Sequence, residues 1–206
     1  MSIRRSTASV IVLSLLLVAC SSTQEPQFRD GDILFQDFPS PQSEAVKLAT
    51  KSKYSHVGVV FIDNGQPMVW EAVQPVKITP AEEWIARDPK GHYVLKRLRG
   101  ADTLLTPQII EKMKSVGMQY MGKNYDPYFG WADDRLYCSE LVWKIYHNGA
   151  GVDLGQPHPM RDFNLSDPLI QTIIRERYGD SVPLDQPVVA PSDLFHCQLL
   201  QTVYVN

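Results

Sequence analysis

One stretch, residues 122–143, constrains this chain more than any other, because it places a cysteine where an irregular segment becomes a helix. Glycine, proline and two aspartates break any regular pattern before Cys138, and apolar residues recur at helical spacing after it, at Leu141, Val142, Ile145 and Tyr146. Free backbone N–H groups and the positive end of the helix dipole favour a negatively charged thiolate at such a position. A cysteine there can be a nucleophile near neutral pH or a small buried apolar residue, and its position alone does not decide between the two.

A thiolate nucleophile needs a base, and the base needs a polar group that orients it. Of the five histidines, His56 alone opens a β-branched and apolar run typical of a buried strand, at 57–61. A hairpin signal at 63–66 follows, and then a second apolar strand that contains Glu71. Because an unpartnered buried carboxylate is costly, Glu71 is expected to pair with His56 across the hairpin. The other histidines are expected to be solvated or structural: His92, His147, His158 and His196.

Five short motifs are similar to those of one known family: GDILF at 31–35, YSHVG at 54–58, WEAV at 70–73, GKNYD at 122–126 and YCSE at 137–140. With further matches at 163–169 and 188–191, the chain resembles the YiiX/YaeF branch of the circularly permuted, papain-like NlpC superfamily. The order of histidine, glutamate and then cysteine is that of the permuted group, which lecithin retinol acyltransferase and its relatives share. The resemblance implies an α+β fold, with a small antiparallel β-sheet packed against helices.

The resemblance also implies roles for individual residues. Cys138 would be the nucleophile, His56 the general base and then acid, and Glu71 the group that orients the imidazole. Tyr125, in a G-x-x-Y pattern, would donate to the oxyanion beside the backbone N–H of Cys138; the alternative is a loop aromatic that only packs. Tyr54 is expected to line the cleft. The walls of that cleft are expected to be aromatic, from Tyr54, Trp70, Tyr128, Phe129 and Trp131.

The first residues of the chain have the pattern of a secretory signal. Arg4 and Arg5 supply a basic start, and the apolar stretch at about 8–19 is too short to span a membrane. A signal peptide is therefore predicted at 1–19.

The sequence LVAC at 17–20 resembles the bacterial lipobox, which implies that lipid is attached to Cys20. Ser21 resembles the following residue of lipoproteins that are sent to the outer membrane. The expected organisation is a lipidated tether at 20–30 and a hydrolase domain at 31–206, anchored in the bacterial envelope and facing the periplasm. The alternative is an ordinary signal peptide that ends near a cysteine.

Composition and spacing exclude several kinds of partner and site. Removal of residues 1–19 would leave 18 of the 20 basic side chains against 23 acidic ones, so no basic surface for nucleic acid is expected. No spacing of cysteines and histidines predicts a metal site, and no cofactor is expected. Beside the nucleophile Cys138, which must stay unpaired, Cys197 is expected to be a buried free thiol. A hydrophobic content of 44% over 206 residues predicts one domain with a real core.

Periodicity predicts the remaining elements. Strands are expected at 32–35, 57–61, 67–73, 93–98 and 199–205, and helices at 43–50, from 79, at 106–120, from 138 and at 170–177. Thr79 is expected to cap the second helix, with Pro80 in its first position. After Gly149 the chain is expected to be irregular apart from its last helix and strand.

Three functions agree with this sequence. The first is a cysteine amidase or peptidase that opens an amide bond of a peptide or an acyl amino acid through an acyl-enzyme. The second is a thiol-dependent esterase or acyltransferase that acts on lipids, and the third is a lipoprotein that binds a ligand without turnover. Because nucleophile, base and orienting group are all present, the prediction is an envelope-anchored thiol hydrolase of the amidase type, with a small-molecule, peptide or lipid substrate.

Overall fold

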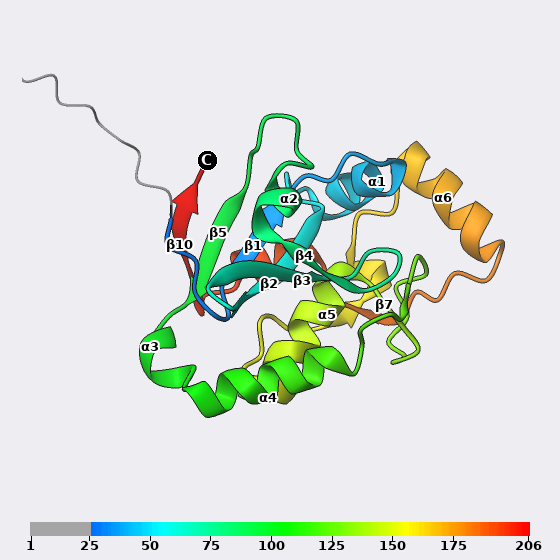
Figure 1. Ribbon diagram of the computed structural model, residues 1–206. Coiled ribbons are helices and arrows are strands. Elements are labelled where there is room, and N and C mark those ends of the chain that lie inside the picture. Colours follow the sequence, from blue (N-terminus) through cyan, green and yellow to red (C-terminus); the bar gives the residue numbers. More distant parts are fainter. Residues whose placement is uncertain (1–25) are drawn as a thin grey trace, which may run out of the picture.

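The structure is a computed structural model that describes residues 26–206. The predicted signal peptide, Cys20 and the first part of the predicted tether lie outside the described residues. The fold is built on a six-stranded antiparallel sheet with the strand order β10-β5-β1-β2-β3-β4 (Figure 1). Its strands are β1 (Ile33–Gln36), β2 (His56–Asp63), β3 (Gln66–Glu71), β4 (Lys77–Pro80), β5 (Val94–Leu98) and β10 (Leu200–Val205). Two short ladders are separate from it, β6 (Asn124–Tyr125) with β7 (Arg135–Leu136), and β8 (His158–Pro159) with β9 (Pro187–Val188).

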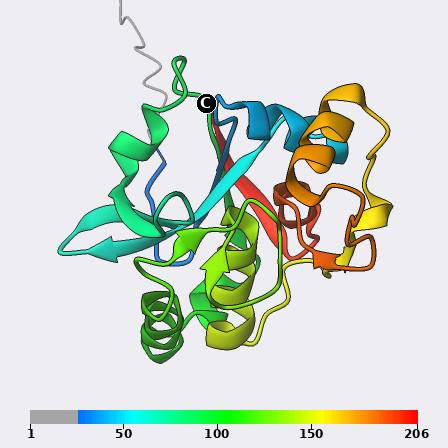
Figure 2. The same cartoon turned by 90° about the vertical axis from the view of Figure 1, so that its right-hand side faces the viewer.

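Helices cover both faces of this sheet (Figure 2). They are α1 (Pro41–Thr50), α2 (Ala81–Ile85), α3 (Ala101–Leu104), α4 (Pro107–Met118), α5 (Cys138–Lys144), α6 (Pro168–Tyr178) and α7 (Pro191–His196), with a π-helix η1 (Ile145–Ala150) and a 3-10 turn η2 (Met160–Asp162). Successive strand residues point to opposite faces, so Ile33 and Phe35 belong to the core under α4 and α5, whereas Leu34 packs with Trp84 of α2. This arrangement confirms the predicted α+β class.

Two helices that are far apart in the sequence, α1 and α6, pack side by side next to the sheet (Figures 1 and 2). Each begins at a polar cap followed by proline: Ser40 accepts from the backbone N–H of Ser43, and Asp167 accepts from that of Leu169. The backbone N–H of Asn164 donates to Ala49 over 3.0 Å, which ties the loop before α6 to the end of α1.

The structure corrects the expected role of Thr79. This residue lies in β4, opposite Val69 of β3, and α2 begins only after Pro80. Its hydroxyl donates to the carboxylate of Glu71 over 2.7 Å instead of capping the helix. The pairing of β4 with β3 and the hydrogen bond to the buried carboxylate outweigh the local capping preference. Both involve β3, which lies outside the short window of sequence that suggested the cap.

The second half of the chain differs in two ways from the expectation. The helix that begins at Cys138 is present, but from Ile145 it continues as a π-helix, and Gly149 lets it approach α4, since a Cβ at 149 would lie 2.6 Å from the Cα of Met113. The region after Gly149 also contains the β8–β9 ladder and α7, which periodicity did not predict. In the part of the chain that the structure describes, no helix has the length and apolar character needed to cross a membrane.

A buried ion pair joins the residue before β1 to β5. Asp32, which has no exposed surface, accepts from Nε and Nη2 of Arg97 over 2.6 and 2.8 Å. It also accepts from the backbone N–H of Arg29 over 2.8 Å. Burial raises the pKa of Asp32, while its hydrogen bonds with Arg97 and Arg29 act in the opposite direction. A second pair, Arg29 with Asp102, lies at the surface, with side chains 49% and 85% exposed.

We expect Asp32→Ala to lower the free energy of unfolding by about 3–5 kcal/mol, because it leaves the charge of Arg97 without its partner in a mostly buried position. Asp102→Ala is the matched control and should change it by less than about 1 kcal/mol, because that pair is solvated. Urea denaturation followed by circular dichroism measures both values. Equal effects of the two substitutions would show that the Asp32–Arg97 pair does not stabilise the sheet.

Candidate active site

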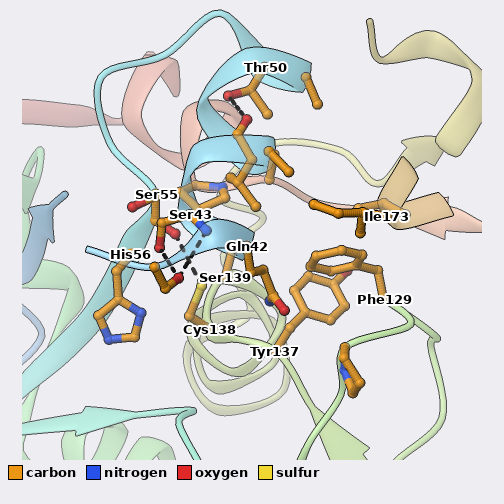
Figure 3. Close-up of a pocket in the computed structure, with 18 of the residues that line it drawn as sticks. Gln42, Ser43, Thr50, Ser55, His56, Phe129, Tyr137, Cys138, Ser139 and Ile173 are labelled. Carbon is orange, nitrogen blue, oxygen red and sulfur yellow. Dashed lines mark hydrogen bonds between the residues drawn. The ribbon is translucent and has the colours of Figure 1, made fainter. Parts of the chain in front are cut away.

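The fold brings the three predicted catalytic side chains to one end of the central strands. Cys138 is the first residue of α5, as predicted, while His56 begins β2 and Glu71 ends β3. Since β2 and β3 are adjacent antiparallel strands joined by a tight turn, the start of one lies beside the end of the other. Helix α5 packs against β2, and Figure 3 shows the thiol of Cys138 beside the imidazole of His56.

The imidazole of His56 is held in one orientation. Its Nε2 lies 2.7 Å from Oε2 of Glu71, so Nδ1 is the ring nitrogen that remains for Cys138. The ring stacks on Trp84 with centroids 5.8 Å apart and lies beside the ring of Phe38. Burial by itself would lower the pKa of His56, but hydrogen bonds with Cys138 and Glu71 outweigh it and raise the pKa to about 9. The imidazole is therefore held as a cation near neutral pH.

Glu71 is held in turn by two residues that sequence reasoning missed as parts of the site. Arg87, just after α2, makes a bidentate salt bridge with Glu71, with Nη1 2.6 Å from Oε2 and Nη2 2.7 Å from Oε1. Thr79 donates to Oε1. Burial would raise the pKa of Glu71, yet hydrogen bonds from His56, Arg87 and Thr79 lower it to about 2. No local pattern marks Arg87, because only the packing of α2 on the sheet brings it to the carboxylate.

A second buried cluster holds the start of α5. Glu140 accepts from the backbone N–H of Tyr137 over 3.3 Å, and Nζ of Lys144 lies 2.7 Å from both Glu140 and Asp133. Burial raises the pKa of Glu140 to about 7, against the lowering effect of Lys144. Because Asp133 belongs to the loop between β6 and β7, this cluster ties the cysteine helix to the segment that carries Tyr125.

Cys138 and His56 lie in the wall of a cavity of about 580 Å³. Figure 3 shows this pair together, with Ile173 of α6 and Phe129 on the other side of the space. Most of the lining is apolar and comes from α1, from α6 and the segment just before it, and from the residues around β9, including Ala45, Val46, Met160, Phe163, Ile174 and Val189. The thiol therefore opens on a space suited to an apolar group.

The structure corrects the expected walls of this cavity. Of the five aromatic residues expected there, Phe129 lines it and the other four do not. Tyr54, also expected to contact substrate, packs instead against Phe195 with ring centroids 4.5 Å apart. The remaining three lie elsewhere, with Trp70 against Phe61, Tyr128 against Tyr178 and Trp131 against Trp143. Sequence gives the residue types near the nucleophile but not the side of the backbone on which each one points.

Tyr125 lines the same cavity as Cys138. The parallel pairing of β6 with β7 places it opposite Leu136, just before the cysteine helix, and its backbone N–H donates to the side chain of Gln74 over 2.8 Å. Its hydroxyl accepts from Nε2 of Gln42 over 2.8 Å. Burial and the nearby Cys138 raise the pKa of Tyr125 well above its usual value, so the hydroxyl keeps its proton.

The other histidines do not line this cavity. His92 is exposed, His147 pairs with Asp153, and His158 pairs with Asp193. Cys197 is a free thiol as expected, but it is partly exposed rather than buried.

No three histidine, cysteine, aspartate or glutamate side chains among residues 26–206 are grouped so that they could hold a metal ion.

Comparisons with known proteins agree with this geometry. A family described as permuted papain-like amidase enzyme, YaeF/YiiX, C92 family, matches residues 27–204. The uncharacterized protein YiiX of Escherichia coli K12 is 43% identical over 194 residues, which cover 94% of each chain. A crystal structure of YiiX from Escherichia coli O157:H7, described as a metalloprotein, is similar with a TM-score of 0.82 and 44% identity, over 86% of this chain and 97% of that one. The chain therefore belongs to the YaeF/YiiX family of permuted papain-like amidases.

Proposed function

We propose that this chain is a thiol amidase in which Cys138 attacks an amide carbonyl, His56 moves the proton and Glu71 holds the imidazole. One observation carries the proposal: His56 is bonded through one ring nitrogen to a fully buried carboxylate and faces a thiol at a helix start with the other. A buried histidine with only a structural role also needs hydrogen-bond partners, but it does not need this combination of a carboxylate and a thiol at a helix start. The family match supports the same class of chemistry.

The reaction would pass through an acyl-enzyme. The thiolate sulfur of Cys138 bonds to the carbonyl carbon, and the electron pair of the C=O bond moves to oxygen. When the C–N bond breaks, the leaving nitrogen takes the proton from Nδ1 of His56. Neutral His56 then accepts a proton from water as the water oxygen attacks the thioester, the C–S bond breaks, and the acid leaves with thiolate and imidazolium restored.

Two donors would stabilise the oxyanion. The backbone N–H of Cys138 is the first of its helix and has no acceptor within that helix. The second donor is the hydroxyl of Tyr125, which lines the cavity. A donor of this kind typically contributes about 3–4 kcal/mol of transition-state stabilisation.

The apolar walls favour a substrate with an apolar part, such as an acyl amino acid or acyl amine, over a wholly polar peptide. The same walls also favour the second candidate function, transfer or hydrolysis of a lipid acyl ester. The two candidates share the acyl-enzyme and differ in the bond that is opened and in the acceptor that resolves the thioester.

Intact mass spectrometry tests the nucleophile. Wild-type protein treated with acyl anilides and activated acyl esters, each with a short and a long chain, should gain one acyl group. Cys138→Ala should gain none, with its fold retained by circular dichroism, because a small side chain replaces a thiol at a helix start. Cys197→Ala is the matched control and should react like wild type, since Cys197 lies outside the cavity.

The relative rates of these probes separate the two candidates. Faster labelling by anilides supports the amidase, and faster labelling by long-chain esters supports lipid acyl chemistry. A folded, reduced wild-type protein that no probe labels would contradict both, and would favour a lipoprotein that binds without turnover.

The support that Glu71 gives to His56 can be measured by pH titration. The pKa of His56 is raised to about 9, so the imidazolium should persist through neutral pH and be lost as the pH rises past that value. Glu71→Gln removes the negative charge while burial still disfavours the cation, so the pKa of His56 should fall.

NMR titration of histidine-labelled protein measures this value, with Glu83→Gln, an exposed carboxylate on α2, as the matched control that should leave it unchanged. The alkaline limb of the acylation rate should move to lower pH by the same amount in Glu71→Gln. An unchanged titration in that variant would remove Glu71 from the proposed triad.

We further propose that lipid on Cys20 anchors the enzyme in the envelope, at the outer membrane and facing the periplasm. The support is the lipobox-like sequence at 17–20. Cys20→Ser should move the protein from the membrane fraction to the soluble fraction and abolish incorporation of labelled palmitate. Unchanged fractionation and labelling in that variant would contradict the anchor.

A further inference from the structure

A chain of hydrogen bonds runs along the cavity from α6 to Tyr125. Nη2 of Arg177 donates to Oε1 of Gln42 over 2.8 Å, and Nε2 of Gln42 donates to the hydroxyl oxygen of Tyr125 over 2.8 Å. All three side chains line the cavity that contains Cys138. They come from α6, α1 and β6, which are far apart in the sequence.

The guanidinium of Arg177 fixes the direction of both hydrogen bonds. A guanidinium has donors and no acceptor, so Gln42 must present its side-chain oxygen to Arg177. The amide nitrogen of Gln42 then faces Tyr125, and because an NH₂ group can only donate, the phenol oxygen must accept. The hydroxyl proton of Tyr125 is therefore left for another acceptor in the cavity.

Arg177 is itself held by the loop that follows Tyr125. Its Nη1 donates to the backbone oxygen of Pro127 over 2.6 Å, and its guanidinium carbon lies 5.8 Å from the centre of the Phe129 ring. One side chain thus fastens both the amide of Gln42 and the Tyr125 loop to α6. A lysine would carry the same charge but lacks the planar fork that reaches two acceptors in fixed directions.

We propose that Gln42 and Arg177 are positioning residues that turn the hydroxyl of Tyr125 toward the oxyanion. The inference rests on the proposed function, because the oxyanion forms only when Cys138 attacks a carbonyl. Helices α1 and α6 would then orient the Tyr125 hydroxyl as well as enclose the substrate. The direction of the Tyr125 donor depends on the contact between these two helices.

Gln42→Glu tests the direction of the hydrogen bonds, because a carboxylate of nearly the same shape accepts from both neighbours. Arg177 keeps a partner, but the hydroxyl of Tyr125 now donates its proton to that carboxylate. In the full chain, acylation by a short-chain acyl nitroanilide would be monitored through the release of nitroaniline and the increase in protein mass.

The expected result is a loss of about 10²–10³-fold in the acylation rate at saturating probe, with little change in the half-saturating concentration. Gln108→Glu makes the same charge change at an exposed position of α4 and should keep the wild-type rate. Gln42→Met, an uncharged variant, leaves the hydroxyl of Tyr125 free to rotate and should lose a smaller factor.

A double-mutant cycle separates positioning from a merely structural role. Tyr125→Phe should lower the acylation rate by a factor similar to that of Gln42→Glu. The double variant should lower it no further than either single variant, because both substitutions remove the same donor. Losses that multiply, or a wild-type rate in Gln42→Glu or Tyr125→Phe, would overturn the inference and leave Cys138 standing as the nucleophile. Acylation that is absent from wild type, or that persists in Cys138→Ala, would overturn the proposed function and this inference with it.

Discussion

The carboxylate of Glu71 is the group on which the rest of the site depends, because it has no exposed surface and is charged. Removing one partner from a buried charge of this kind typically costs several kcal/mol, so its surroundings are strongly constrained. The partners come from three places in the fold: His56 from β2, Thr79 from β4 and Arg87 from just after α2. Satisfying one carboxylate thus fixes the relative placement of two strands and a helix, and leaves the imidazole of His56 in a single orientation.

The sheet carries His56 and Glu71, whereas helices form much of the cavity beside them. Helix α5 brings the thiol of Cys138 to the sheet, and α1 and α6 supply much of the apolar cavity. The chain after residue 153 has two tasks, since α6 and β9 contribute to the cavity whereas β10 pairs with β5 and completes one edge of the sheet. The cavity is consequently assembled from both ends of the domain.

Local signals in the sequence indicated where the three proposed catalytic residues lie, and the family resemblance suggested their roles. The change from irregular chain to helical periodicity located Cys138 at the start of α5, and the tight turn between two apolar strands placed Glu71 within reach of His56. Both patterns depend on residues close together in the sequence, so a short window of sequence records them. The same reasoning failed at Thr79, where a local capping pattern competed with a strand ladder and a buried carboxylate.

The sequence by itself thus determined the α+β class, the order of the proposed catalytic residues and the pairing of His56 with Glu71, because periodicity and turn chemistry are properties of neighbouring residues. Only the tertiary structure decided which side chains support them. Arg87, Gln42 and Arg177 reach their partners because separate elements pack together, and no short window of sequence records that packing. The aliphatic character of the cavity was decided in the same way, since a residue's type does not give the direction of its side chain once helices from distant segments meet.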